Sequence, residues 1–575
     1  MTLTRAQLRP SDAVPAAPAG PPVTRARAGR AVRTGGLVLL AAVPLLVLAV
    51  LFFYPVGTMI GRGLGDAGAG LDILARPRFR RIALFTVGQA AASAALCVLL
   101  GLPVAHLVYR CRFPGRAAVR ALLTVPFVLP TVVVALAFRT LLAQDGLLGS
   151  WRLDGSVAAV LAAHVCLNTA VVVRTVGVSW ARLDRRPGDA ARSLGASPSR
   201  VFLTVTLPAL APAVAAAFTL VFLFCATSFG IVLILGGARY GTLETEIYRQ
   251  TEDLLDLPAA AVLSVVQILL VAAVLGVAAL LRRRTERTLT AAPARPTGLR
   301  GRDLPAVLVT LVALAVTVGP LVVLAVRSLR GPGGWTLANY RALGTLGSDV
   351  QLVPVTTALG YSLRAAVVAT AVALLLGVPL AVVLARRPRG RWARRWIGLL
   401  DGVAMLPLGV SAVTVGFGFL VALDRPPLDL RSSALLVPLA QALVATPLVV
   451  RMLLPVLRAV DDRLRQAAGL LGAGPLAVWW GVDLPLLARP LAGAAAFAFA
   501  VSLGEFGATS FLARPQTPTV PVLIARLISR PGAQNTATAL AAATVLGLLC
   551  LAVVAAVDGL LDARSTDRPG AVGGF

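Results

Sequence analysis

The sequence predicts an all-α polytopic membrane protein with about 12 transmembrane helices, built as two parallel six-helix repeats. Of its 575 residues, 58% are hydrophobic and 14% are charged, and the mean hydropathy is +0.84. A soluble chain of this length would need more polar surface to cover its domains. Apolar runs of about 20 residues, the length that crosses a bilayer as a helix, recur along the whole chain. A polar segment between such runs also occurs twice.

The apolar runs mark the expected spans in order. In the first half they lie at about 37–60, 82–109, 117–141, 156–178, 209–235 and 258–281. In the second half they lie at about 304–326, 357–385, 396–422, 432–457, 486–512 and 535–557. Six spans in each half bring both halves into the membrane from the same side, which makes the repeat parallel and not inverted.

Five domains and tails follow from these runs. We expect a disordered cytoplasmic tail at 1–36, a first transmembrane domain at 37–281, a charged cytoplasmic linker at 282–303, a second transmembrane domain at 304–560 and a C-terminal tail at 561–575. The tail and the linker are rich in Arg, whereas the two domains are mostly apolar.

The net charge of +29 is spread over many short loops and does not form a basic helix with interleaved aromatic residues. We therefore expect the positive loops to face an anionic lipid surface and no nucleic acid to be bound. With both termini in the cytoplasm, the inward loops hold 33 Arg residues and the outward loops hold 16. The positive-inside rule then places both copies of the repeated segment in the cytoplasm.

The repeated segment reads DAARSLGASPSRVFLTVTLP at 189–208 and QAAGLLGAGPLAVWWGVDLP at 466–485, and the two copies align without a gap at an offset of 277. The residues that carry the pattern are Asp189, Ala190, Ala191, Gly195 and Pro208 in the first copy, and Gln466, Ala467, Ala468, Gly472 and Pro485 in the second. Small side chains let another protein approach closely, and the Gly is expected to end the helix. The Pro is expected at the start of the next span.

A repeated cytoplasmic loop of this kind predicts a lever on which a soluble motor acts twice. The pattern EAAxxxG with Pro thirteen residues after the Gly resembles the coupling loop of permease subunits in bacterial binding-protein-dependent ABC importers. The fused permeases of ferric iron and thiamine importers are the most similar, and Gln466 departs from the acidic residue usual in the family. Supporting segments are AHVCLNTAVVVRT at 163–175, LGGARYGTLETEIYRQT at 235–251 and SLGEFGATSF at 502–511.

The resemblance implies two ATPase subunits on the cytoplasmic loops and an extracytoplasmic solute-binding protein on the other side. The sequence has no GxxxxGK[ST] loop, so we expect ATP to be hydrolysed on another polypeptide, no cofactor to be bound by this chain, and the chain itself not to be an enzyme. Ferric iron and thiamine are nearly equal candidates for the substrate, and a small anion or a polyamine is a further alternative.

Three polar residues within the spans are candidates for a translocation path: Glu505, Ser228 and Asn168. A carboxylate in a span is costly unless it is paired or hydrated, and Glu505 is expected either to meet a cationic cargo or to pair with an Arg. His164 and Asn168 lie one turn apart and are expected to hydrogen-bond between helices. The acidic outward loop at 236–257 is expected either to be merely solvated or, by resemblance, to meet the binding protein.

Two other classes of protein fit parts of the pattern. A 12-span ion-coupled secondary transporter also has a parallel repeat, but it would carry charge pairs within the membrane. A membrane-embedded enzyme would gather acidic, His or Cys residues at one membrane face. With two His and five scattered Cys residues, the sequence predicts no metal site.

Overall fold

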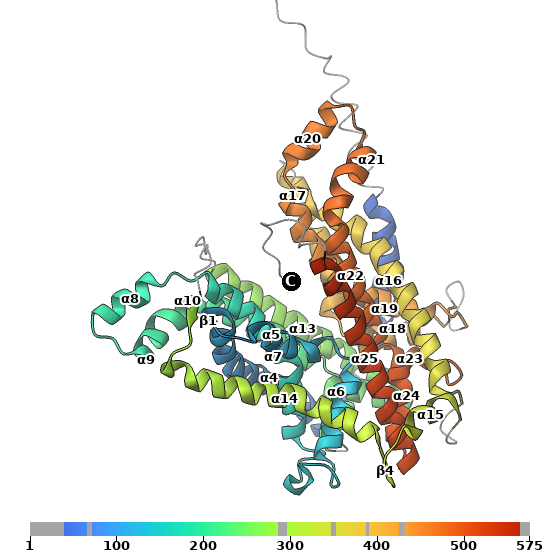
Figure 1. Cartoon of the computed structure of the whole chain (residues 1–575). Coiled ribbons are helices and arrows are strands. Elements are labelled where there is room, and N and C mark those ends of the chain that lie inside the picture. Colours follow the sequence, from blue (N-terminus) through green and yellow to red (C-terminus); the bar gives the residue numbers. More distant parts are fainter. Residues whose placement is uncertain are drawn as a thin grey trace, which may run out of the picture.

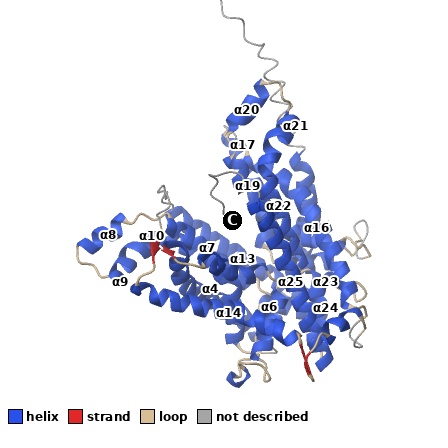
Figure 2. Cartoon of the chain, viewed as in Figure 1, coloured by secondary structure: helices blue, strands red, loops and turns tan. Residues whose placement is uncertain are grey.

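The computed structural model describes residues 40–65, 72–237, 239–285, 296–346, 352–386, 390–424, 429–430 and 432–563. The predicted tail at 1–36, residues 286–295 of the linker and residues 564–575 of the C-terminal tail lie outside these residues. Figure 2 shows that the described chain is almost wholly helical, as the sequence predicts. The domain boundaries themselves remain predictions.

The first half begins with the span Leu40–Gly63, which includes η1 (Ala49–Phe53) and α2 (Tyr54–Leu64). Its further helices are, in order, α4 (Pro77–Arg110), α5 (Arg116–Val128), α6 (Thr131–Leu142), η2 (Gly149–Trp151), α7 (Val157–Ala181), α8 (Arg186–Ser193), α9 (Pro198–Val201), η3 (Phe202–Thr206), α10 (Leu207–Ala226), α11 (Gly230–Leu235), α12 (Leu243–Glu252) and α13 (Leu257–Thr285).

The second half repeats this order. Its helices are η4 (Gly301–Asp303), α14 (Leu304–Ser328), α15 (Ala338–Arg341), η5 (Ala342–Gly344), α16 (Val355–Ala385), α17 (Arg391–Gly409), α18 (Ala412–Ala422), α19 (Leu436–Ala459), α20 (Asp462–Leu470), α21 (Pro475–Val478), η6 (Trp479–Asp483), α22 (Leu484–Leu503), α23 (Thr509–Leu512), α24 (Val520–Ser529) and α25 (Ala533–Ala563). Two strand pairs complete the fold: β1 (Cys111–Arg112) beside β2 (Thr297–Gly298), and β3 (Arg330–Gly331) beside β4 (Gly334–Trp335).

Ten of the described helices are long and apolar enough to cross a membrane, or up to 12 if each of two bent pairs counts as one span. The bent pairs are the predicted spans 117–141 and 396–422, and the prediction that each is one continuous helix is wrong. α5 and α6 meet at 104°, and α17 and α18 meet at 86°. Pro130 explains the first break, because proline holds the preceding Leu129 in an extended conformation. At the second break, the Ser411 side chain caps α18 by accepting from the Thr414 N–H.

The predicted spans 209–235 and 486–512 are also interrupted. α10 ends at Ala226 before α11 begins at Gly230, and α22 ends at Leu503 before α23 begins at Thr509. Each half therefore has a non-helical break near the same place. Non-helical backbone at membrane depth is tolerated only where protein or a water-filled cavity surrounds it.

The two halves exchange their first spans. α14, the first span of the second half, packs against α4 and α6 of the first half. In return, α2 packs against α18 of the second half, where a Cβ on Gly418 would lie 3.3 Å from Pro55. The largest cluster of buried apolar side chains accordingly runs through both halves. In Figure 1 the chain forms two diverging arms, with α8 and α9 at the end of one and α20 and α21 at the end of the other.

Candidate functional site

The two repeated loops, residues 189–208 and 466–485, begin with short helices that carry no buried residue, α8 and α20. Asp189 lies in the first turn of α8, as expected, and pairs with Arg192 at 3.2 Å on the surface. Gln466 lies beyond the first turn of α20, where Asp462 supplies the acidic side chain instead. The second helix therefore begins earlier relative to the repeated pattern than the first.

The two alanines of each copy differ in how far they are exposed. Ala190 on α8 and its equivalent Ala467 on α20 are exposed, whereas Ala191 and its equivalent Ala468 are half-buried. Neighbouring residues of a helix do not share a face, so a partner that meets Ala467 does not meet Ala468 in the same way. The first alanine of each pair, Ala190 or Ala467, is thus the one that the loop presents fully.

Both helices end in the way that the sequence predicts. Gly195 has φ +84° and Gly472 has φ +85°, the left-handed region in which glycine is preferred. After each glycine, the next N–H reaches back five residues: Ala196 donates to the Ala191 carbonyl and Ala473 to the Ala468 carbonyl, both at 3.0 Å. This i−5 bond is the signature of the Schellman C-cap. The two loops thus share one turn geometry as well as one sequence pattern.

Large apolar side chains lie uncovered on both loops. Leu194 and its equivalent Leu471 are 88% and 89% exposed, and Leu203 and its equivalent Trp480 are 60% and 66% exposed. The same positions are therefore exposed in both copies of the repeated loop, and the two copies lie at the ends of the two arms (Figure 1).

The expectation that Pro208 and Pro485 begin the next spans also needs a correction. Each lies in the first turn of α10 or α22, but these helices continue without interruption from α9 and α21, so the spans run over Pro198–Ala226 and Leu476–Leu503. A π-helical turn, η3 or η6, precedes each proline. Since proline has no N–H for the regular helical bond, the wider turn accommodates it within one helix. The loops are therefore rigidly joined to membrane spans.

A largely buried ion pair also distinguishes the second loop from the first. Arg465 on α20 donates from Nε to Asp483 at 2.8 Å and from Nη1 to Asp462 at 2.8 Å. The Asp483 side chain is only 6% exposed and the Arg465 side chain 17%. In the first loop, Gly188 and Thr206 occupy the positions of Arg465 and Asp483. The second loop is thus fastened to its span by a buried ion pair that the first loop cannot form.

We expect Arg465→Ala to destabilise the protein by about 3 kcal/mol, because it leaves the Asp483 carboxylate buried without its partner. Arg192→Ala is the matched control: its ion pair with Asp189 is exposed, so its loss should cost under about 1 kcal/mol. Thermal denaturation of the purified protein in detergent measures both effects. Equal melting temperatures for the two variants would show that the Arg465–Asp483 ion pair contributes no more to stability than the exposed Arg192–Asp189 pair.

The breaks in the spans meet where the two halves come together. Phe229 and Phe506 occupy equivalent positions at the offset of 277, and their rings stack with centroids 5.1 Å apart. A Cβ on Gly504 would lie 2.9 Å from Pro130, and one on Gly416 would lie 2.7 Å from the Ala508 Cα. Glycine at these points lets the backbones of neighbouring segments touch. The stacked rings therefore lie at a contact between equivalent parts of the repeat.

Glu505 lies in the break after α22 and is 7% exposed. Its two carboxylate oxygens accept from the Ala508 N–H at 2.7 Å and the Thr509 N–H at 2.9 Å. It therefore caps α23. Among the described residues no Arg pairs with Glu505, and its contact with a cationic cargo remains a prediction. Its equivalent, Ser228, is also buried.

Asn168 lies inside the first half. Its Nδ2 donates to the His164 carbonyl at 3.0 Å and to the Cys225 Sγ of α10 at 3.6 Å. His164 Nδ1 lies 3.1 Å from the Ser93 hydroxyl of α4. The contacts with Cys225 and Ser93 are the helix–helix hydrogen bonds expected for the pair. The assignment of Glu505, Ser228 and Asn168 to a translocation path remains a prediction.

The acidic segment at 236–257 is not simply solvated. Glu246 is buried and accepts from Arg78 Nη2 at 3.0 Å and Gln250 Nε2 at 2.7 Å. Glu244 is fully buried and accepts from Gln267 Nε2 at 2.9 Å and from the Ser411 hydroxyl at 2.8 Å. Because Ser411 lies at the break between α17 and α18, Glu244 joins the first half to the second. The solvated interpretation is therefore wrong for Glu244 and Glu246, whereas Glu252 and Asp253 of the same segment are exposed.

Comparison with known proteins identifies relatives over most of the chain. The profile of the family described as "Binding-protein-dependent transport system inner membrane component" matches residues 97–287 and 377–567. The thiamine transport system permease protein ThiP of Brucella abortus is 28% identical over 535 residues, covering 90% of this chain and 95% of that protein. ThiP of Salmonella typhimurium is 26% identical, covering 83% and 88% respectively. A solved bacterial ABC transporter involved in alginate import matches 45% of this chain at 15% identity, with a TM-score of 0.40.

Proposed function

This chain belongs to the family of binding-protein-dependent transport system inner membrane components and is a multi-pass membrane permease of an ATP-binding cassette importer, and we propose that its substrate is thiamine. The observation that carries the proposal is the relation to ThiP proteins over 90% of this chain and 95% of theirs. Such a match covers both halves and the connection between them. Thiamine is thereby favoured over ferric iron and over the other substrates that the sequence left open.

The two repeated loops are the proposed docking surfaces for two ATPase subunits on the cytoplasmic side. Their matching Schellman turns and exposed leucines support this assignment, since one protein could bind both in the same way. ATP would be bound and hydrolysed by these partners, with no cofactor held by the permease. An extracytoplasmic binding protein would deliver thiamine from the opposite side, and both termini would lie in the cytoplasm.

Each loop can transmit motion because it continues directly into a span. α9, η3 and α10 form one helix, and so do α21, η6 and α22. At the far end of these helices lie the breaks that bring Phe229 and Phe506 together. Drawing the two arms together at the loops would turn α10 and α22 and separate the stacked rings. The Phe229–Phe506 pair is the proposed closure of the path in the form seen here.

The proposal is tested by uptake of radiolabelled thiamine into proteoliposomes that contain the permease, its candidate ATPase and its candidate binding protein. We expect accumulation that requires ATP and both partners and that excess unlabelled thiamine abolishes, whereas ferric iron leaves it unchanged. An ATP-dependent uptake that responds to ferric iron and not to thiamine would contradict the substrate. Uptake that follows an ion gradient without ATP would favour the secondary transporter.

A further inference from the structure

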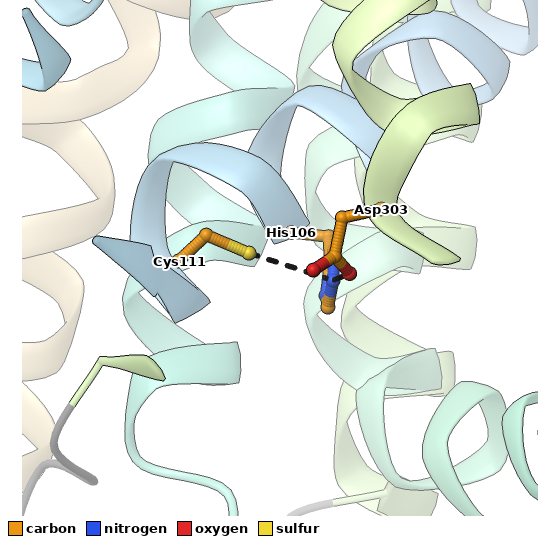
Figure 3. Close-up of side chains that lie close together, drawn as sticks. All are labelled: His106, Cys111 and Asp303. Atoms are coloured by element: carbon orange, nitrogen blue, oxygen red, sulfur yellow. Dashed lines mark hydrogen bonds and ion pairs between the residues drawn. The ribbon is translucent and has the colours of Figure 1, made fainter. Parts of the chain in front are cut away.

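Three side chains with metal-binding atoms meet at the end of α4, although the sequence analysis predicted no metal site. His106 lies on the last turns of α4, Cys111 begins β1, and Asp303 ends η4 just before α14. Figure 3 shows that they point toward one another from the two halves of the chain. Their ligand atoms all lie within 4.8 Å of one another. Nearly 200 residues separate Asp303 from the other two, so no sequence spacing could reveal the group.

Two of the separations between ligand atoms are close to those of a tetrahedral metal site. His106 Nε2 lies 3.2 Å from Asp303 Oδ1 and 3.8 Å from Cys111 Sγ. Metal bonds of about 2.0–2.3 Å at tetrahedral angles place such ligand atoms about 3.3–3.6 Å apart. Since all three ligand atoms lie within 4.8 Å of one another, binding would require them to approach one another by about 1 Å at most.

The surroundings hold each group in place. Asp303 Oδ2 accepts from the Arg300 N–H at 3.0 Å, which leaves Oδ1 directed at the imidazole. The His106 ring lies against Trp180, with centroids 5.3 Å apart. Cys111 is fixed by the pairing of β1 with β2, opposite Thr297. Contacts of this kind orient the ligands of protein metal sites and strengthen binding.

We propose that His106, Cys111 and Asp303 bind a divalent ion of the zinc class that fastens the start of α14 to the end of α4. Sulfur, imidazole nitrogen and one carboxylate are the ligands of zinc, whereas magnesium and calcium require several oxygen ligands. The Cys111 thiolate and the Asp303 carboxylate balance the charge of the ion within an arginine-rich region. The His106 side chain is 34% exposed, so the site opens to solvent and leaves a position for water.

The ion would strengthen the packing of α14, the first span of the second half, against the first half. Asp303 immediately precedes α14, and α14 packs against α4, α5, α6 and α7 of the first half. At this end of α14, the described part of the linker meets the first half through short contacts, the β1–β2 pair and the His106–Asp303 contact. A metal bond there would fix the first turn of α14 to the first half. The site lies one aromatic ring away from the first repeated loop, because Trp180 also stacks on Phe202 of that loop with centroids 6.0 Å apart.

Cobalt titration of the full-length chain tests the site without any transport assay. The protein is purified in detergent with a streptavidin-binding tag in place of polyhistidine, treated with chelator and reductant, and titrated with Co²⁺. We expect a sulfur-to-cobalt charge-transfer band that saturates at about one ion per chain and disappears when Zn²⁺ is added. Zn²⁺ should also raise the melting temperature of the parent protein.

Variants separate this site from other thiols. Cys111→Ser should abolish the band, and His106→Ala should weaken Co²⁺ binding at least about tenfold. Cys550→Ser, which removes a buried thiol of α25, should match the parent. Absence of the band in the parent, or a band of equal intensity in Cys111→Ser, overturns the proposal. If Cys111→Ser aggregates, Asp303→Asn is the variant that tests the site. An unchanged Co²⁺ affinity together with an unchanged Zn²⁺ thermal shift in Asp303→Asn would also overturn the proposal.

Discussion

Replacing Gly195 and Gly472 with valine should abolish co-purification of the ATPase and thiamine uptake while leaving the permease folded. Both glycines have left-handed φ values, which cost an ordinary residue about 1–2 kcal/mol and a β-branched residue more. A Cβ at either position would meet nothing within 4 Å, so the effect acts through the backbone conformation alone. ATPase binding should fall about tenfold for each loop altered, since about 1.4 kcal/mol corresponds to a factor of ten.

The double variant Gly195→Asn and Gly472→Asn is the matched control. Asparagine adopts the left-handed conformation more readily than other residues, so this protein should keep most of its ATPase binding. Gel filtration shows whether each variant remains monodisperse. If the valine and asparagine proteins bind the ATPase equally well, the turn geometry is irrelevant to docking and another surface must be sought.

Glu505→Ala should lower the thermal stability and the membrane abundance of the protein strongly, and Glu505→Gln should do so about half as much. The alanine leaves the Ala508 and Thr509 N–H groups buried without an acceptor, and each such group costs about 1–3 kcal/mol. The glutamine keeps one side-chain oxygen that can accept one of these bonds. The melting temperature and the amount of protein in purified membranes should both decrease in the order parent, Glu505→Gln, Glu505→Ala.

The same variants distinguish the cap from a binding site for cationic cargo. A residue that meets thiamine would lose uptake equally in Glu505→Gln and Glu505→Ala, with both proteins at normal abundance. Ser228→Ala, at the equivalent position of the first half, removes no carboxylate cap and should remain close to the parent in stability. Normal stability in Glu505→Ala would refute the capping role.

The sequence by itself determined the features that depend on neighbouring residues. Apolar runs predicted the helical membrane fold, because the bilayer sets the length of a span independently of its partners. The repeat at a fixed offset predicted two similar loops, and Gly195 and Gly472 have the conformation that their position after a short helix demands. The family followed from the same loops.

Only the tertiary structure decided the features that join distant segments. Hydropathy cannot tell a straight span from one bent at Pro130 or Ser411, because both halves of a bent span are apolar. Nor can it show that α14 packs on the first half, since that depends on which helix surfaces fit together. Glu505 is a helix cap, and His106, Cys111 and Asp303 are neighbours, because packing brings their backbones together. Local sequence sets which segments become helices, and long-range packing sets which polar groups those helices place in contact.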